Sequence, residues 1–186
     1  MKEIIIISGV PRSGTSLMMQ ILEKAGLEIM SDGIRQKDES NPEGYYELEA
    51  VKGIVKDNFF LKMAEGKVIK IVAPLPMFMD KTLSYKAVFM RRNLDEVLRS
   101  QEVMLNKDQT AEREKFRKIF EGHIEKTLQY FETNKIPYLE IQHRNLIQEP
   151  ENEIEKLAKF LDLSVSLESL VGVVNPNLYR NKHNVS

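Results

Sequence analysis

The chain has 186 residues, which predicts one domain, and a chain of that length buries about 70% of the surface that its unfolded form exposes. Its 27 basic and 28 acidic side chains leave a net charge of −1, which argues against a nucleic-acid partner bound through bulk positive charge. The absence of cysteine excludes disulfides, thiolate metal sites and thiol nucleophiles, and it fits a reducing, cytoplasmic location. The first apolar run, Ile4–Ile7, is too short for a signal peptide or a membrane span.

Short apolar runs alternate with helical patterns along the chain. The β-branched run Ile4–Ser8 predicts a strand, and the helical pattern over Thr15–Ala25 ends at Gly26. Further strands are predicted at Val68–Ala73, Ala87–Met90 and Tyr138–Ile141, and further helices at Leu94–Leu105, Glu112–Asn134 and Glu151–Leu161.

This alternation predicts right-handed βαβ units and therefore a three-layer α/β fold, with a mostly parallel central sheet flanked by helices. We expect a single domain over residues 1–186, with a core at about 3–163 and a tail at 164–186. The weakly patterned stretches Glu28–Glu43 and Leu163–Ser186 are predicted to be loops that line the site.

The strongest local signal is a glycine-bounded turn between the first strand and the first helix, from Gly9 to Ser16. Gly9 and Gly14 have the Gly-x4-Gly spacing of a phosphate-binding loop, whose backbone N–H groups converge on an anion. The positive end of the following helix dipole and the hydroxyls of Thr15 and Ser16 favour the same ligand. The alternative is an ordinary strand-to-helix turn capped by Ser or Thr.

This loop differs from an ATP or GTP loop at one position. Thr15 stands where a nucleotide-binding loop has lysine, and the cation is Arg12, inside the loop. None of the predicted strands ends in the aspartate that a magnesium-dependent enzyme uses. The sequence therefore predicts a phosphorylated ligand that is held without a metal.

Two motifs in the expected order resemble the sulfotransferase family, which transfers sulfonate from 3′-phosphoadenylyl sulfate (PAPS) and releases PAP. The loop Gly9-Val-Pro-Arg-Ser-Gly-Thr-Ser16 resembles the phosphosulfate loop of its carbohydrate, protein-tyrosine and bacterial branches. The second motif is a strand followed by Arg92 and, eight residues later, Ser100. Asn41–Glu47 and Leu146–Leu161 resemble further family segments. The resemblance implies a P-loop-type fold.

The resemblance also implies roles for individual residues. It assigns the 3′-phosphate to Arg92 and Ser100, while Arg12 is expected, as a fixed planar cation, to stabilise charge on the bridging oxygen of the donor. Arg91 and Arg92 follow one another at a strand end, so their side chains leave opposite faces, and the family spacing selects Arg92. Without the resemblance, a hydrogen bond from Ser100 to a helical carbonyl is the simpler expectation. The loop residues expected to bind the nucleotide are Gly9, Pro11, Arg12, Ser13, Gly14, Thr15 and Ser16.

The acceptor of the sulfonate also needs a general base. The family lysine corresponds to Lys70, but its histidine position is Val72 here, and other branches use a glutamate. We expect Glu47 to be the base, with Glu43 as the alternative, while a solvated carboxylate remains the simpler reading of both. Lys70 either assists Arg12 or is a strand-edge lysine. Asp32 and Asp80 are weaker candidates.

The tail and the histidines complete the candidate residues. Arg180 is predicted to close over the 3′-phosphate, and a frayed terminus is the alternative. The three histidines do not have the spacing of a metal site.

The predicted function is therefore metal-independent transfer of sulfonate to a hydroxyl or amine of a small-molecule or glycan acceptor. A divergent P-loop small-molecule kinase and a PAP- or PAPS-binding module without catalysis are the alternatives. Two loops are candidates for the acceptor site, Gly26–Tyr46 and Asn106–Ala111.

Overall fold

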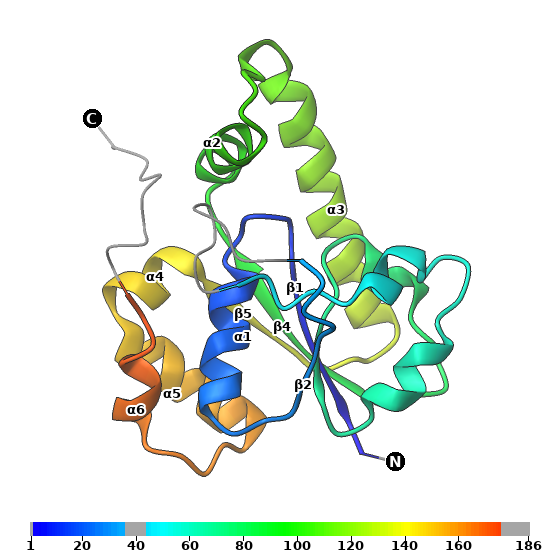
Figure 1. Cartoon of the computed structure of the whole chain (residues 1–186), viewed down its shortest axis with the longest axis vertical. Coiled ribbons are helices and arrows are strands. Elements are labelled where there is room, and N and C mark those ends of the chain that lie inside the picture. The colour runs from blue at the N-terminus through cyan, green and yellow to red at the C-terminus, as the bar shows by residue number, and fades with distance from the viewer. Residues whose placement is uncertain (1, 36–43, 176–186) are drawn as a thin grey trace.

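The structure, a computed structural model, describes residues 2–35 and 44–175. Its centre is a five-stranded parallel sheet in the order β2-β3-β1-β4-β5. This arrangement confirms the predicted α/β class with a mostly parallel sheet between helices (Figure 1). The strands are β1 (Ile4–Gly9), β2 (Ile29–Met30), β3 (Val68–Lys70), β4 (Tyr85–Arg91) and β5 (Tyr138–Gln142).

The sheet separates two hydrophobic cores, because successive side chains of a strand point to opposite faces. In β1, Ile4 and Ile6 pack into one core and Ile7 into the other. The first core is closed by α2 (Leu94–Leu105), α3 (Arg113–Thr133) and short 3-10 turns. The second is closed by α1 (Thr15–Lys24), α4 (His143–Gln148), α5 (Pro150–Leu161) and α6 (Leu167–Val171) (Figure 1).

Several predicted boundaries differ from the structure. The strand predicted at Val68–Ala73 ends at Lys70, and the one predicted at Ala87–Met90 extends over Tyr85–Arg91. The two stretches predicted as loops contain β2 and α6, so that prediction was wrong at those positions. The 3-10 turns were not predicted: η1 (Glu49–Gly53), η2 (Phe59–Ala64), η3 (Leu75–Phe78) and η4 (Thr110–Glu112).

Parallel pairing brings the carboxyl ends of the central strands to one edge of the sheet. Ile7 of β1 is in register with Lys70 of β3, and Gly9 with Met90 of β4. β1 lies between β3 and β4, so the strand order reverses direction at β1. The loop after β1 therefore leaves the sheet at a topological switch point. Open α/β sheets bind their ligands at such points.

None of the described helices combines the length and hydrophobicity that a membrane span requires.

Candidate functional site

The loop after β1 has a backbone that only certain residues adopt. Gly9 and Gly14 have φ values of 138° and 102°, and Arg12 has a φ of 69°. A Cβ on Gly9 would lie 2.5 Å from Oγ of Ser13 and 2.6 Å from the carbonyl of Met90. Glycine is therefore required at position 9 both by conformation and by space. A left-handed arginine costs about 1–3 kcal/mol and persists only where its surroundings hold it.

The interior of the loop is lined by hydroxyls. Ser13 is fully buried, and its Oγ has no hydrogen-bond partner among the described residues. The backbone N–H of Ser13 is used within the loop, by the carbonyl of Val10 at 3.1 Å. Thr15 begins α1 and is buried, and Ser16 donates to the carbonyl of Tyr45 at 3.4 Å. Buried polar groups normally have partners, so the lone Ser13 hydroxyl points to a ligand.

Arg12 places its guanidinium against α2. Its Nε donates to Oγ of Ser100 at 3.0 Å, and its Nη1 lies 3.8 Å from Sδ of Met104. Burial is the main cause that lowers the pKa of Arg12, but an arginine stays charged at any physiological pH. Arg12 and Ser100, 88 residues apart in sequence, are thus in direct contact.

Arg92 holds the loop from the other side. Its Nη1 donates to the carbonyl of Arg12 at 3.1 Å, and its Nε donates to Glu96 at 3.0 Å. Arg91 instead forms an ion pair with Glu140 of β5, 3.3 Å away. The two arginines therefore separate as their alternation predicts, and Arg92 is the one beside the loop. Ser100, expected to act with Arg92, is hydrogen-bonded to Arg12 in this structure.

A second cluster forms around the segment before η1. Lys70 is buried at the end of β3 and donates to the carbonyl of Tyr45, and its Nζ lies 3.8 Å from Oε1 of Glu47. Arg35 donates to the same Oε1 at 2.8 Å. Burial, opposed by Glu47, lowers the pKa of Lys70 to about 8. The structure thus brings Glu47 and Lys70 together, with Lys70 buried between two strands and not at the edge of the sheet.

The remaining predicted residues lie elsewhere. Pro11 is exposed at the tip of the loop. Asp32 accepts from the backbone N–H groups of Ile34 and Glu49, which lowers its pKa. Asp80 likewise accepts from Thr82, which lowers its pKa. Two further candidates, Glu43 and Arg180, lie outside the described residues.

His143 lies directly against the phosphate loop. A Cβ on Gly14 would come within 2.5 Å of Cδ2 of His143, so ring and loop are tightly packed. Burial, together with the positive charge of Arg92, lowers the pKa of His143 to about 3. The ring is therefore neutral at physiological pH. Sequence reasoning connected this histidine with no site.

Other site residues missed from the sequence belong to the two clusters. Glu96 follows Arg92 by four residues, a spacing that signals an ion pair on a helix. Met104 follows Ser100 by one helical turn and therefore shares its face. No comparable signal marks Arg35, which lies in a weakly patterned stretch and reaches Glu47 only through the fold.

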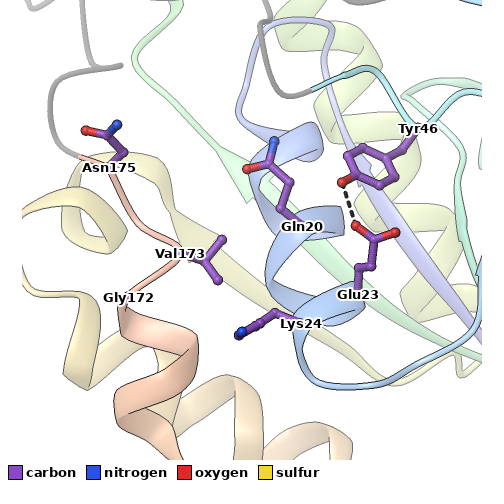
Figure 2. A pocket seen from close by; sticks show the side chains of 7 residues that line it. All are labelled: Gln20, Glu23, Lys24, Tyr46, Gly172, Val173 and Asn175. Atoms are coloured by element: carbon purple, nitrogen blue, oxygen red, sulfur yellow. Dashed lines mark hydrogen bonds between the residues drawn. The ribbon is translucent and has the colours of Figure 1, made fainter.

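A separate pocket of about 550 Å³ lies beside α1 (Figure 2). On its wall the hydroxyl of Tyr46 donates to Glu23 at 2.7 Å. None of the residues predicted to be catalytic or nucleotide-binding lines it, although Tyr46 directly follows Tyr45 of the second cluster. The lining residues are Gln20, Glu23, Lys24, Tyr46, Gly172, Val173 and Asn175.

Known structures share this fold at low identity. The mouse sulfotransferase SULT7A1 complexed with PAP aligns with a TM-score of 0.62 and 16% identity, over 96% of this chain and 64% of that chain. The chain thus spans just under two thirds of the mouse protein. The sulfotransferase domain of the Synechococcus PCC 7002 olefin synthase aligns with a TM-score of 0.56 and 15% identity, over 100% of this chain and 91% of that one. STF9 from Mycobacterium avium aligns with a TM-score of 0.55 and 9% identity, over 92% and 67%.

Sequence comparison gives the family. No curated protein matches the chain. The family described as "Sulfotransferase domain" matches residues 2–184, which includes both motifs and nearly the whole sequence. The chain therefore belongs to the sulfotransferase domain family.

Proposed function

We propose that the protein is a sulfotransferase that moves a sulfonate group from PAPS to a hydroxyl or amine of a small-molecule or glycan acceptor. The observation that carries this proposal is the phosphate loop whose only side-chain cation, Arg12, is fixed on Ser100 of α2. Membership of the sulfotransferase domain family supports it. So do the structural neighbours, one of which is complexed with PAP.

The residues of the loop fit this donor. The buried Ser13 hydroxyl and the first turn of α1 offer donors to a 5′-phosphosulfate, and the glycines leave the backbone open to it. Arg92 and Ser100 would hold the 3′-phosphate, and Arg180 would close over it. Bound PAPS supplies an activated sulfonate on a phosphate leaving group.

The remaining steps of the transfer depend on three side chains with separate roles: Arg12, Lys70 and Glu47. Arg12 stabilises negative charge at the bridging oxygen, because a partly buried, fixed cation needs little reorganisation. Lys70, largely protonated below pH 8, adds a second positive charge near Glu47. Glu47 accepts the proton of the acceptor hydroxyl or amine. Since two side-chain cations supply the positive charge, the proposal includes no metal.

The two alternative functions, a kinase and a binding module without catalysis, would require different features of this site. A kinase would need a lysine after the second glycine and an aspartate at a strand end, whereas Thr15 begins α1 and the strands flanking β1 end in Lys70 and Arg91. A binding module without catalysis would need the loop but not Glu47.

Calorimetric titration with PAP and with ATP–Mg²⁺ separates a sulfotransferase from a kinase. We expect PAP to bind more tightly, and tighter binding of ATP–Mg²⁺ would contradict the proposal. A transfer assay over a broad acceptor panel separates enzyme from binding module. In that assay Glu47→Gln should lower kcat by about 10²–10⁴-fold while PAP affinity is unchanged. No transfer by the unmutated chain would favour the module.

A further inference from the structure

Glu47 is held by one of its two carboxylate oxygens. Both neighbouring cations approach Oε1: Nη1 of Arg35 at 2.8 Å and Nζ of Lys70 at 3.8 Å. Among the residues that the structure describes, Oε2 has no hydrogen bond or ion pair. The Glu47 side chain is 28% exposed, so solvent reaches it. A carboxylate fixed in this way keeps one oxygen able to accept a proton.

Arg35 is itself fixed from three sides. Its guanidinium carbon lies 3.5 Å from the centroid of the Tyr45 ring, and that ring is buried. Its Nη1 binds Glu47, and its Nη2 lies 3.6 Å from Sδ of Met104 on α2. An arginine stacked on a ring and paired with a carboxylate has lost much of its rotamer freedom before any ligand binds. This preorganisation is what a catalytic group requires of its support.

We propose that Arg35 is the positioning residue for Glu47: it binds Oε1 and leaves Oε2 to accept the proton of the acceptor. The inference rests on the proposed function, in which Glu47 is the general base. Lys70 is less suited to this task, because its Nζ lies farther from Oε1 and also donates to the carbonyl of Tyr45.

The distances single out Arg35 among the cations near Glu47. These are Arg35, Lys70 of β3 and Lys52 of η1, and only Arg35 is within hydrogen-bonding distance of the carboxylate. A misplaced base slows proton transfer without weakening nucleotide binding. Removing Arg35 should therefore lower kcat and leave the KM for PAPS unchanged.

The test compares Arg35→Gln with Arg35→Lys and with the control Arg91→Gln. The Arg91 side chain is 35% exposed and that of Arg35 is 40% exposed. Arg91 also forms an ion pair with a glutamate, but its partner is Glu140 and not Glu47. For Arg35→Gln we expect kcat to fall about tenfold, with the KM for PAPS and the affinity for PAP unchanged. Arg35→Lys should restore part of the lost kcat, and Arg91→Gln should change neither kcat nor PAP affinity.

A second measurement separates positioning from a structural role. In a Glu47→Gln background, Arg35→Gln should lower kcat by less than about twofold, because the group that it supports is already gone. The same loss of kcat with and without Glu47 would overturn the role of Arg35. Absence of transfer by the unmutated chain despite tight PAP binding would instead overturn the proposed function, and the base with it. Thermal unfolding of each variant identifies a change that only unfolds the protein.

Discussion

The phosphate loop and the Glu47 segment fix their charged groups by different means. In the loop the backbone is fixed, since Gly9 and Gly14 take positive φ and Arg92 binds the carbonyl of Arg12. Glu47 is fixed by side chains, chiefly by an ion pair to Arg35 in which both partners are partly exposed. Exposed ion pairs contribute only about 0–1 kcal/mol. The loop is therefore rigid through its backbone, whereas the position of Glu47 depends on the side chain of Arg35.

This difference predicts different consequences of substitution. A preformed anion site lowers the cost of ordering a bound donor, so changes in the loop should affect donor binding or stability as well as turnover. Glu47, the proposed base, is positioned by one side chain. Changes around it should therefore affect turnover alone.

The largest effect is expected from Arg12→Ala. Removing a fixed cation at the developing charge should lower kcat by about 10²–10³-fold and also weaken PAP binding. The hydrogen bond from Arg92 to the carbonyl at position 12 does not depend on the Arg12 side chain, so it should still hold the loop. Initial rates and PAP titration measure both effects, with Arg91→Ala as the control. Retention of more than a third of the activity would contradict this prediction, because Arg12 would then not be a catalytic cation.

Gly9→Ala tests whether the loop depends on its backbone. The new Cβ would meet Ser13 and the carbonyl of Met90, at a φ of 138° that alanine rarely adopts. We expect a loss of about 1–3 kcal/mol in the free energy of unfolding and loss of PAP binding.

The matched control for this substitution is Gly122→Ala. Gly122 lies in α3, where a Cβ would meet nothing within 4 Å, and alanine there should stabilise the helix by up to about 1 kcal/mol. Denaturant unfolding compares the two variants. Equal stability of Gly9→Ala and the unmutated chain would show that the loop is not rigid.

The smallest expected effect is the response of Lys70 to pH. Its pKa is lowered to about 8, so the ammonium form, which is proposed to assist transfer, is lost as the pH rises through 8. The rate should fall on this alkaline limb, by up to about tenfold. In Lys70→Arg the limb should disappear, because arginine keeps its charge. Rate profiles of both proteins on one acceptor measure the limb, and an identical limb in Lys70→Arg would assign it to another group.

The two regions also differ in how far the sequence predicts them. Gly9, Gly14 and Arg12 lie in one short turn, and the spacing of the two glycines predicts its backbone conformation. The structure places that turn between β1 and α1 as predicted. The approach of Arg92 to the loop follows from strand alternation. Ser100 was expected beside the same site, and it reaches the loop through Arg12.

The Glu47 cluster was only partly predictable. Glu47 and Lys70 were candidates, but their contact depends on a buried lysine turning toward the carbonyl of Tyr45. Arg35 joins them through a side-chain contact that no periodicity encodes. The two-residue β2 and the 3-10 turns were missed for a related reason: elements this short carry too few residues to show a repeat.

The contacts of Arg12 also make the site dependent on complete folding of the chain. Its hydrogen bonds to Ser100 and from Arg92 join positions 88 and 80 residues apart, so they form only once β1, β4 and α2 are assembled. A ligand bound at Arg12 therefore stabilises the assembled sheet and not an isolated turn. By mass action, a nucleotide present at a hundred times its Kd adds about 2.7 kcal/mol to the folded state.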